Sequence, residues 1–177
     1  EDNIPLSTHM LKNNDQIINL LKEAGLSNRK EDRVKIIYYP TYITSTDGLL
    51  NINYEDAVSG SHIGVFPSLY EPWGYTPLET AAAGVLTITT DLTGFADYIK
   101  QNAKSYDGNS GIFILKRKEG ADAVVVEELT ETLEKIVKTK RSERIQDKLE
   151  ARNLSEMCDW KNLIKNYFAL YNKAFMD

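Results

Sequence analysis

The chain has 177 residues, 42% of them hydrophobic, and its 21 basic and 26 acidic side chains leave a formal net charge of −5. This length can bury one substantial core, so one soluble domain is expected. No stretch approaches the roughly 20 apolar residues of a membrane helix, and an acidic chain without a basic arm is not typical of nucleic-acid binding.

Cysteine and histidine are too few for several kinds of site. Cys158 is the only cysteine and His9 and His62 are the only histidines, so neither an intramolecular disulfide nor a Cys/His metal cluster is expected. A lone thiol suits a reducing cytoplasm. The first residues, Glu-Asp-Asn-Ile-Pro, lack both a signal-peptide pattern and an initiator methionine. We therefore expect a cytoplasmic protein and interpret the chain as a fragment.

The first third of the chain predicts one helix, one strand and one irregular stretch. An amphipathic pattern predicts a helix over residues 10–24 with Gly25 as its C-cap. The apolar run 34–39, ended by Pro40, predicts a strand. Residues 41–53 form the least regular stretch.

The middle of the chain alternates predicted strands and helices. A helix is expected near Tyr54, strands over 62–67, 85–89 and 111–115, and helices over 77–83, stopped by Gly84, and beyond Gly94. This alternation is typical of an α/β, Rossmann-like fold, with a mostly parallel sheet flanked by helices and ligand loops at one edge. Helices are then predicted over 123–140, 142–154 and 159–175.

The segment from Tyr70 to Glu79 joins the predicted strand 62–67 to a helix and reads Tyr-Glu-Pro-Trp-Gly-Tyr-Thr-Pro-Leu-Glu. Thr76 is the expected N-cap, Pro77 the first helical residue and Glu79 the last member of a capping box. The unpaired N–H groups and the positive end of the helix dipole make this helix start a suitable anion site.

Each residue type in this segment has two interpretations. Glu79 either completes the capping box or binds a ligand. Glu71 is either a ligand-binding acid or a solvated loop acid. Trp73 and Tyr75 either contact a ligand or pack the loop, and Gly74 allows close approach of the backbone.

This segment closely resembles the signature of UDP-glucose-dependent glycogen synthases of the fungal and animal type. Segments that agree in the same order extend the resemblance over nearly the whole chain: Asp32 to Lys35, Tyr54, Gly60 to His62, Val65 to Ser68, Thr89 to Phe95 and Asp159 to Lys161. The resemblance implies a retaining glucosyltransferase of GT-B architecture, in which two Rossmann-like domains face a cleft. It places residues 1–155 in the C-terminal nucleotide-sugar-binding domain and 156–177 in a C-terminal helix.

The resemblance also implies substrates and partners. Such enzymes transfer glucose from UDP-glucose to the non-reducing end of an α-1,4-glucan, glycogen, with retention of configuration and without a required cofactor or metal. The implied partners are UDP-glucose, glycogen, the enzyme's own N-terminal acceptor domain and further copies in a homo-oligomer, with no nucleic acid or membrane. The family's two phosphate-neutralising cations come from earlier strands, so the fragment alone is expected to be inactive.

Two alternatives stay open. The first is another GT-B glycosyltransferase or a nucleotide-sugar epimerase, because two glutamates at the spacing of Glu71 and Glu79 are shared widely across that class. The second is a non-catalytic regulatory or assembly domain that kept the fold.

At matching positions the resemblance implies residue roles. Glu71 takes the place of the catalytic acid beside the donor glucose, and Glu79 that of the ribose ligand. Tyr54 falls where an aromatic ring stacks on uracil, although its sequence context alone favours a core or helix-start aromatic. The implied donor-binding set is Tyr54, Trp73, Gly74, Tyr75, Thr76 and Glu79, with the backbone of 74–76 holding the diphosphate.

A second group of candidate site residues is basic. Arg141, Arg144, Lys148 and Arg152 are spaced by three, four and four residues, which places them on one helical face. In some members of the resembling family a helix here senses glucose 6-phosphate, whereas the interleaved acids favour a salt-bridged surface helix. His62 is interpreted as a structural histidine.

Overall fold

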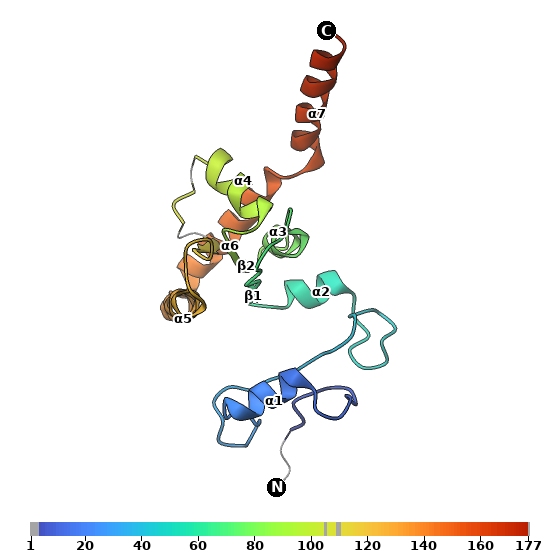
Figure 1. Cartoon of the computed structure of the whole chain (residues 1–177), viewed down its shortest axis with the longest axis vertical. Helices are drawn as coiled ribbons and strands as arrows, with labels where there is room; N and C mark the ends of the chain where they lie inside the picture. The colour runs from blue at the N-terminus through green and yellow to red at the C-terminus, as the bar shows by residue number, and fades with distance from the viewer. Residues whose placement is uncertain (1–3, 105, 109–110, 177) are drawn as a thin grey trace. The chain divides into compact units, whose positions relative to one another are not determined.

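The computed structural model describes residues 4–104, 106–108 and 111–176. Residues 1–3, which entered the signal-peptide argument, lie outside the described residues. Internal contacts divide the chain into an N-terminal unit, Glu1–Ile52, and a C-terminal unit, Asn53–Asp177. Figure 1 shows the first in blue and the second in green to red.

The N-terminal unit contains one helix, α1 (Gln16–Glu23), which is shorter than predicted. It begins late because Asn14 has a left-handed φ of 66° and the Asp15 carboxylate caps the helix, accepting from the amides of Ile17 and Ile18 at 3.0 and 3.1 Å. Its end agrees with the prediction, since Gly25 follows the C-cap with a φ of 75°.

The prediction of a strand over residues 34–39 is wrong. Only Tyr38 pairs, in an isolated parallel bridge to Ser7, and Ile37 is 74% exposed. The backbone of Ile36 bonds instead to the Asn28 side chain, which accepts from the Ile36 amide and donates to its carbonyl at 2.7 Å each. Those groups cannot then join a ladder.

The C-terminal unit is built on a parallel sheet in the order β1 (Ile63–Val65), β2 (Leu86–Thr90) and β3 (Ile112–Leu115). Ile63 pairs with Leu86, and Thr87 with Ile112. Helix α2 (Tyr54–Ser59) precedes β1, α3 (Tyr75–Ala82) connects β1 to β2, and α4 (Gly94–Asn102) connects β2 to β3. The parallel α/β fold is therefore confirmed.

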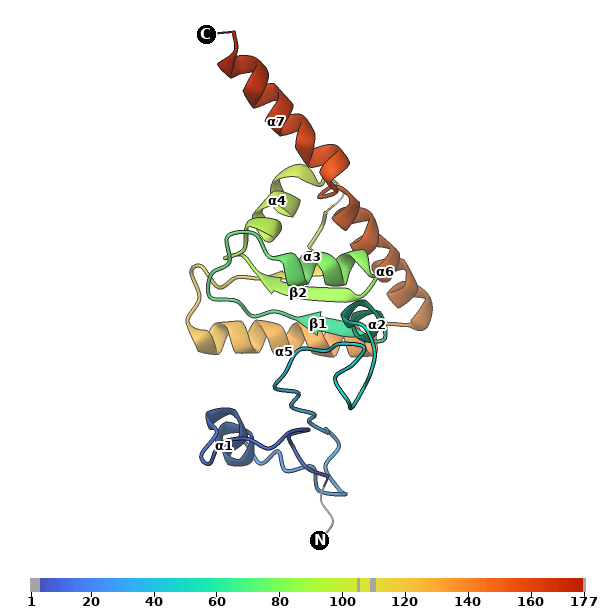
Figure 2. The same ribbon diagram turned by 90° about the vertical axis from the view of Figure 1, so that its right-hand side faces the viewer.

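Helices cover both faces of this sheet. Alternate residues of β2 face opposite sides, and Leu86 and Ile88 belong to a cluster with Val125 and Ile136 of α5 (Asp122–Lys138). A second cluster joins Phe95 of α4 to α6 (Arg141–Glu156). In Figure 2, α3, α4 and α6 lie on one side of the sheet and α5 lies on the other.

The last helix, α7 (Trp160–Ala174), agrees with the helix predicted over 159–175, and its N-cap is Asp159, whose carboxylate accepts from the Lys161 amide at 2.8 Å. It contains no buried residue, and Figure 2 shows it extending from the end of α6. Among the described residues, no helix is long and apolar enough to cross a membrane.

Candidate functional site

The loop that carries Glu71 is held at the carboxyl edge of the sheet, the edge where parallel α/β sheets bind ligands. The Glu71 amide donates to the carbonyl of Leu92 at 3.0 Å, and its carbonyl accepts from the Gly94 amide at 3.3 Å. These bonds make an isolated parallel bridge between the loop after β1 and the loop after β2. The backbone of Glu71 is therefore fixed although it lies outside any strand.

Gly94 makes this close approach possible. A Cβ atom at position 94 would overlap the carbonyl oxygen of Pro72. Phe95, the next residue, is fully buried and its amide donates to the carbonyl of Trp73 at 2.7 Å. The backbone of residues 71–73 therefore runs alongside that of residues 93–95. The approach is so close that only a glycine fits at position 94.

The Glu71 side chain is half-buried, and the hydroxyl of Ser68 donates to its Oε2 at 3.4 Å. The carboxylate therefore lies over the loop rather than in the core. Within the described residues, no group of three or more His, Cys, Asp or Glu side chains is arranged to hold a metal ion.

The start of α3 differs from the predicted cap. Gly74, with a φ of 110°, is the N-cap, so Thr76 lies inside the first turn and Glu79 is too far along to complete a capping box. The prediction of Thr76 as cap and Glu79 as box partner is wrong because a buried glycine in the left-handed region already turns the chain into the helix. The amides of Tyr75 and Thr76 now lie in the first turn, where they have no intrahelical acceptor.

The two aromatic residues of the motif lie differently. Trp73 is half-buried and packs against Phe95 and Tyr98 of α4, with ring centroids 6.4 and 5.7 Å apart. Trp73 also lines a cavity of about 570 Å³ with Tyr75 and Glu79. Tyr75 is 67% exposed at the helix start, where it is accessible to a ligand.

Tyr54 and Glu79, far apart in the sequence, line the same cavity of about 160 Å³ with Glu55, Val58 and Ala83. Burial raises the pKa of the Tyr54 phenol, and the Glu79 carboxylate raises it further by its charge and by accepting a hydrogen bond from the hydroxyl. The phenol therefore stays neutral beside the Glu79 carboxylate. The aromatic face and the acid are placed together by packing of α2 beside α3.

A second cavity, of about 400 Å³, is bounded by the basic face of α6. Arg141, Arg144 and Lys148 line it with His62, which stands just before β1. Arg152, the fourth cation of the predicted face, does not line it. The sequence interpretation of His62 as structural missed this placement, since only the packing of α6 beside β1 and β2 brings a residue 79 positions before Arg141 to the same cavity.

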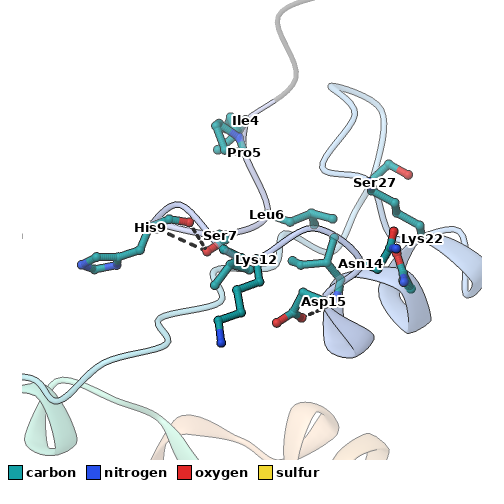
Figure 3. A pocket seen from close by; sticks show the side chains of 13 residues that line it. Ile4, Pro5, Leu6, Ser7, His9, Lys12, Asn14, Asp15, Lys22 and Ser27 are labelled. Atoms are coloured by element: carbon teal, nitrogen blue, oxygen red, sulfur yellow. Dashed lines mark hydrogen bonds between the residues drawn. The ribbon is translucent and has the colours of Figure 1, made fainter.

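The N-terminal unit has a cavity of its own, of about 650 Å³, shown in Figure 3. Two of its polar groups are engaged locally: Asp15 caps α1, and the Ser7 hydroxyl donates to the carbonyl of His9 at 2.8 Å. The remaining lining combines apolar side chains with the lysines and with Asn14, Asn19 and Ser27. These groups do not form an arrangement for chemistry.

Comparison with known proteins bears on the whole chain. The profile of the family described as "Glycogen synthase" matches residues 1–176. This chain belongs to the glycogen synthase family. It is 41% identical to the glycogen [starch] synthase of Dictyostelium discoideum and 38% identical to isoform 2 of Saccharomyces cerevisiae, in each case over 92% of the chain. The mouse liver glycogen [starch] synthase is 36% identical, also over 92% of the chain.

The family match covers a part of each relative. The chain spans 19% of the Dictyostelium protein, 24% of the yeast protein and 23% of the mouse protein. Among solved structures, a sucrose-phosphate synthase from Thermosynechococcus elongatus matches 90% of the chain and 34% of its own length, with a TM-score of 0.60 and 17% identity. That likeness agrees with the α/β fold, and the predicted resemblance to glycogen synthases is confirmed.

Proposed function

We propose that this glycogen synthase-family chain supplies part of the donor-binding half of a retaining glucosyltransferase that extends an α-1,4-glucan from UDP-glucose. The observation that carries the proposal is the shared cavity of Tyr54 and Glu79, which is lined by α2 and by the second half of α3. An aromatic ring next to a carboxylate suits a nucleoside, because the ring can stack on the base and the acid can accept from the ribose hydroxyls.

The same proposal assigns binding residues to the diphosphate and to the glucose of the donor. The amides of Tyr75 and Thr76 at the start of α3 would hold the diphosphate, and the dipole of α3 favours its negative charge. Glu71, fixed by its backbone bonds to Leu92 and Gly94, would face the donor glucose. A carboxylate there stabilises the positive charge that develops at the anomeric carbon.

The whole enzyme is part of this proposal. The acceptor glucan would bind to an N-terminal acceptor domain outside this chain. We assign residues 1–155 to the C-terminal donor domain and residues 156–177 to the C-terminal segment that contains α7. A cytoplasmic location, the absence of a required cofactor and assembly into a homo-oligomer are proposed with it.

Calorimetric titration of the full-length enzyme with UDP and with ADP tests the proposal. We expect UDP to bind more tightly, and Tyr54→Ala and Glu79→Gln to weaken UDP binding about tenfold each, as loss of one stacking or charged contact implies. Tyr171→Ala, an exposed tyrosine of α7, is the matched control. Tighter binding of ADP would indicate another donor, and no binding of either nucleotide would favour the non-catalytic alternative.

The basic cavity supports a second proposal, regulation by a sugar phosphate. Arg141, Arg144 and Lys148 line, with His62, a cavity of about 400 Å³, which is large enough for a hexose phosphate. The test is activation by glucose 6-phosphate: Arg141→Ala with Lys148→Ala should abolish it while basal turnover remains. Arg152→Ala on the same helix should preserve activation, and equal loss in both variants would reject the cavity as the site.

A further inference from the structure

Thr90, the last residue of β2, places a fully buried hydroxyl between the two loops that define the position of Glu71. The hydroxyl donates to the carbonyl of Ser68, in the loop after β1, at 2.8 Å. It also accepts from the amide of Leu92, in the loop after β2, at 3.4 Å. Figure 2 shows both strands pointing to the same edge, where these loops leave toward α3 and α4.

The two residues that the Thr90 hydroxyl contacts are two of the three that bond to Glu71, the third being Gly94. The Ser68 hydroxyl donates to the Glu71 carboxylate at 3.4 Å, and the Leu92 carbonyl accepts from the Glu71 amide at 3.0 Å. One hydroxyl thus ties together the residue that orients the Glu71 side chain and the residue that anchors its backbone. Removing it would free the two loops to shift relative to each other.

The neighbouring threonines of β2 show that strand formation does not account for this hydroxyl. Thr89 is equally buried, and its hydroxyl has no hydrogen-bond partner among the described residues. The Thr87 hydroxyl donates to the carbonyl of Val85, two residues earlier in the same segment, at 3.1 Å. Threonine is common in strands because it is β-branched, but Thr90 alone of these three bonds to the loop that carries Glu71.

We propose that Thr90 is a positioning residue for Glu71, which rests on the role of Glu71 in the proposed glucosyl transfer. A carboxylate that stabilises charge in a transition state must be held within a fraction of an ångström, and displacement of about 1 Å costs turnover by roughly 100-fold. Thr90 lies beneath the loops rather than against the substrate, so it acts through Ser68 and Leu92.

The test uses the full-length enzyme with Thr90→Val, Thr90→Ser and Thr89→Val. Thr90→Val replaces the hydroxyl by a methyl group of similar size, and we expect kcat to fall at least about tenfold while the dissociation constant of UDP changes by less than about twofold. Thr90→Ser keeps the hydroxyl and should restore kcat to near the wild-type value. Thr89→Val removes a hydroxyl that has no partner and should leave kcat unchanged.

Ser68→Ala provides a variant that does not disturb the core, and it should lower kcat with UDP affinity retained. The proposal is overturned if Thr90→Val keeps wild-type turnover, if Thr90→Ser fails to rescue it, or if Thr89→Val loses as much. Loss of UDP affinity in proportion to turnover would also overturn it, because that pattern indicates general disruption of the donor site. Absence of glucosyl transfer by the wild-type enzyme would instead reject the proposed function.

Discussion

At the scale of single residues, two carboxylates of one motif have different surroundings. Glu79 lines a small cavity beside the phenol of Tyr54, whereas Glu71 lies on a loop whose backbone is fixed. Among the described residues, the Glu71 carboxylate accepts a hydrogen bond from the Ser68 hydroxyl at 3.4 Å. An acid that lies beside an aromatic ring suits binding of the substrate in its ground state. A half-buried acid on a rigid loop suits action on charge that appears during a reaction.

Glu71→Gln in the full-length enzyme separates these roles, because it removes the charge and keeps the shape. We expect kcat to fall about 100-fold or more, since one preorganised electrostatic contact is worth roughly that much, with UDP affinity preserved. Initial rates and calorimetric titration measure the two quantities. Glu127→Gln, an exposed acid of α5, is the control. Retained turnover with weakened UDP binding would show that the roles are reversed.

At the scale of elements, the site depends on how the loops after the three strands are joined. Backbone bonds join the first loop to the second at Glu71 and Gly94. The carboxylate of Asp91 joins the second to the third by accepting from the amides of Arg117 and Lys118 at 2.8 and 2.9 Å. The carboxyl edge of the sheet is therefore one connected framework.

Gly94→Ala tests the first junction. The added Cβ would overlap the Pro72 carbonyl, so residues 71–73 must move away from α4. We expect the free energy of unfolding to fall by about 1–3 kcal/mol, the usual cost of overpacking, and kcat to fall with it. Urea denaturation and rate measurements check this. Gly60→Ala, at a right-handed C-cap with a φ of −72°, should have a smaller effect, and equal effects would contradict the argument.

Asp91→Ala tests the second junction. It leaves two amides of the loop after β3 without their acceptor, which should lower the free energy of unfolding by about 1–3 kcal/mol. Asp91→Asn retains an oxygen acceptor and should lose less. Thermal and urea denaturation measure both, with Asp97→Ala, an exposed residue of α4, as the control. If the Asn variant were as unstable as the Ala variant, the two amide bonds would not be the reason.

Sequence patterns predicted the ends of helices correctly where the residues next to the end determine it. Gly84 and Gly25 follow the helices they were expected to end, and Asp159 caps α7. They failed where a tertiary contact competed: Asn28 takes the backbone groups of Ile36 from the predicted strand, and Gly74 replaces Thr76 as the cap of α3. In both cases the local preference was weaker than a packed alternative.

At the scale of the whole molecule, the chain matches only a part of the length of its relatives. It corresponds to about a fifth to a quarter of the length of its Dictyostelium, yeast and mouse relatives. The proposed donor site uses residues of the C-terminal unit, while glucosyl transfer also needs an acceptor site and cations for the donor phosphates.

The 177-residue chain by itself is therefore expected to transfer no measurable glucose from UDP-glucose to glycogen, and to bind UDP weakly. Incorporation of labelled glucose into glycogen measures the first expectation and calorimetry the second, with the full-length enzyme as the positive control. A robust transfer rate for the chain alone would show that its own residues complete the catalytic site.

The sequence by itself determined the parallel α/β class, the family, and the motif from Glu71 to Glu79, because each is written in residues close together in the chain. The tertiary structure alone decided which distant residues meet: Tyr54 with Glu79, His62 with Arg141, and Thr90 with Ser68. The physical reason is that helix packing and the parallel order of the strands bring together residues whose own neighbours carry no sign of the contact. The sequence motif predicts the loop that carries Glu71, but it does not indicate the Thr90 hydroxyl that we propose to position it.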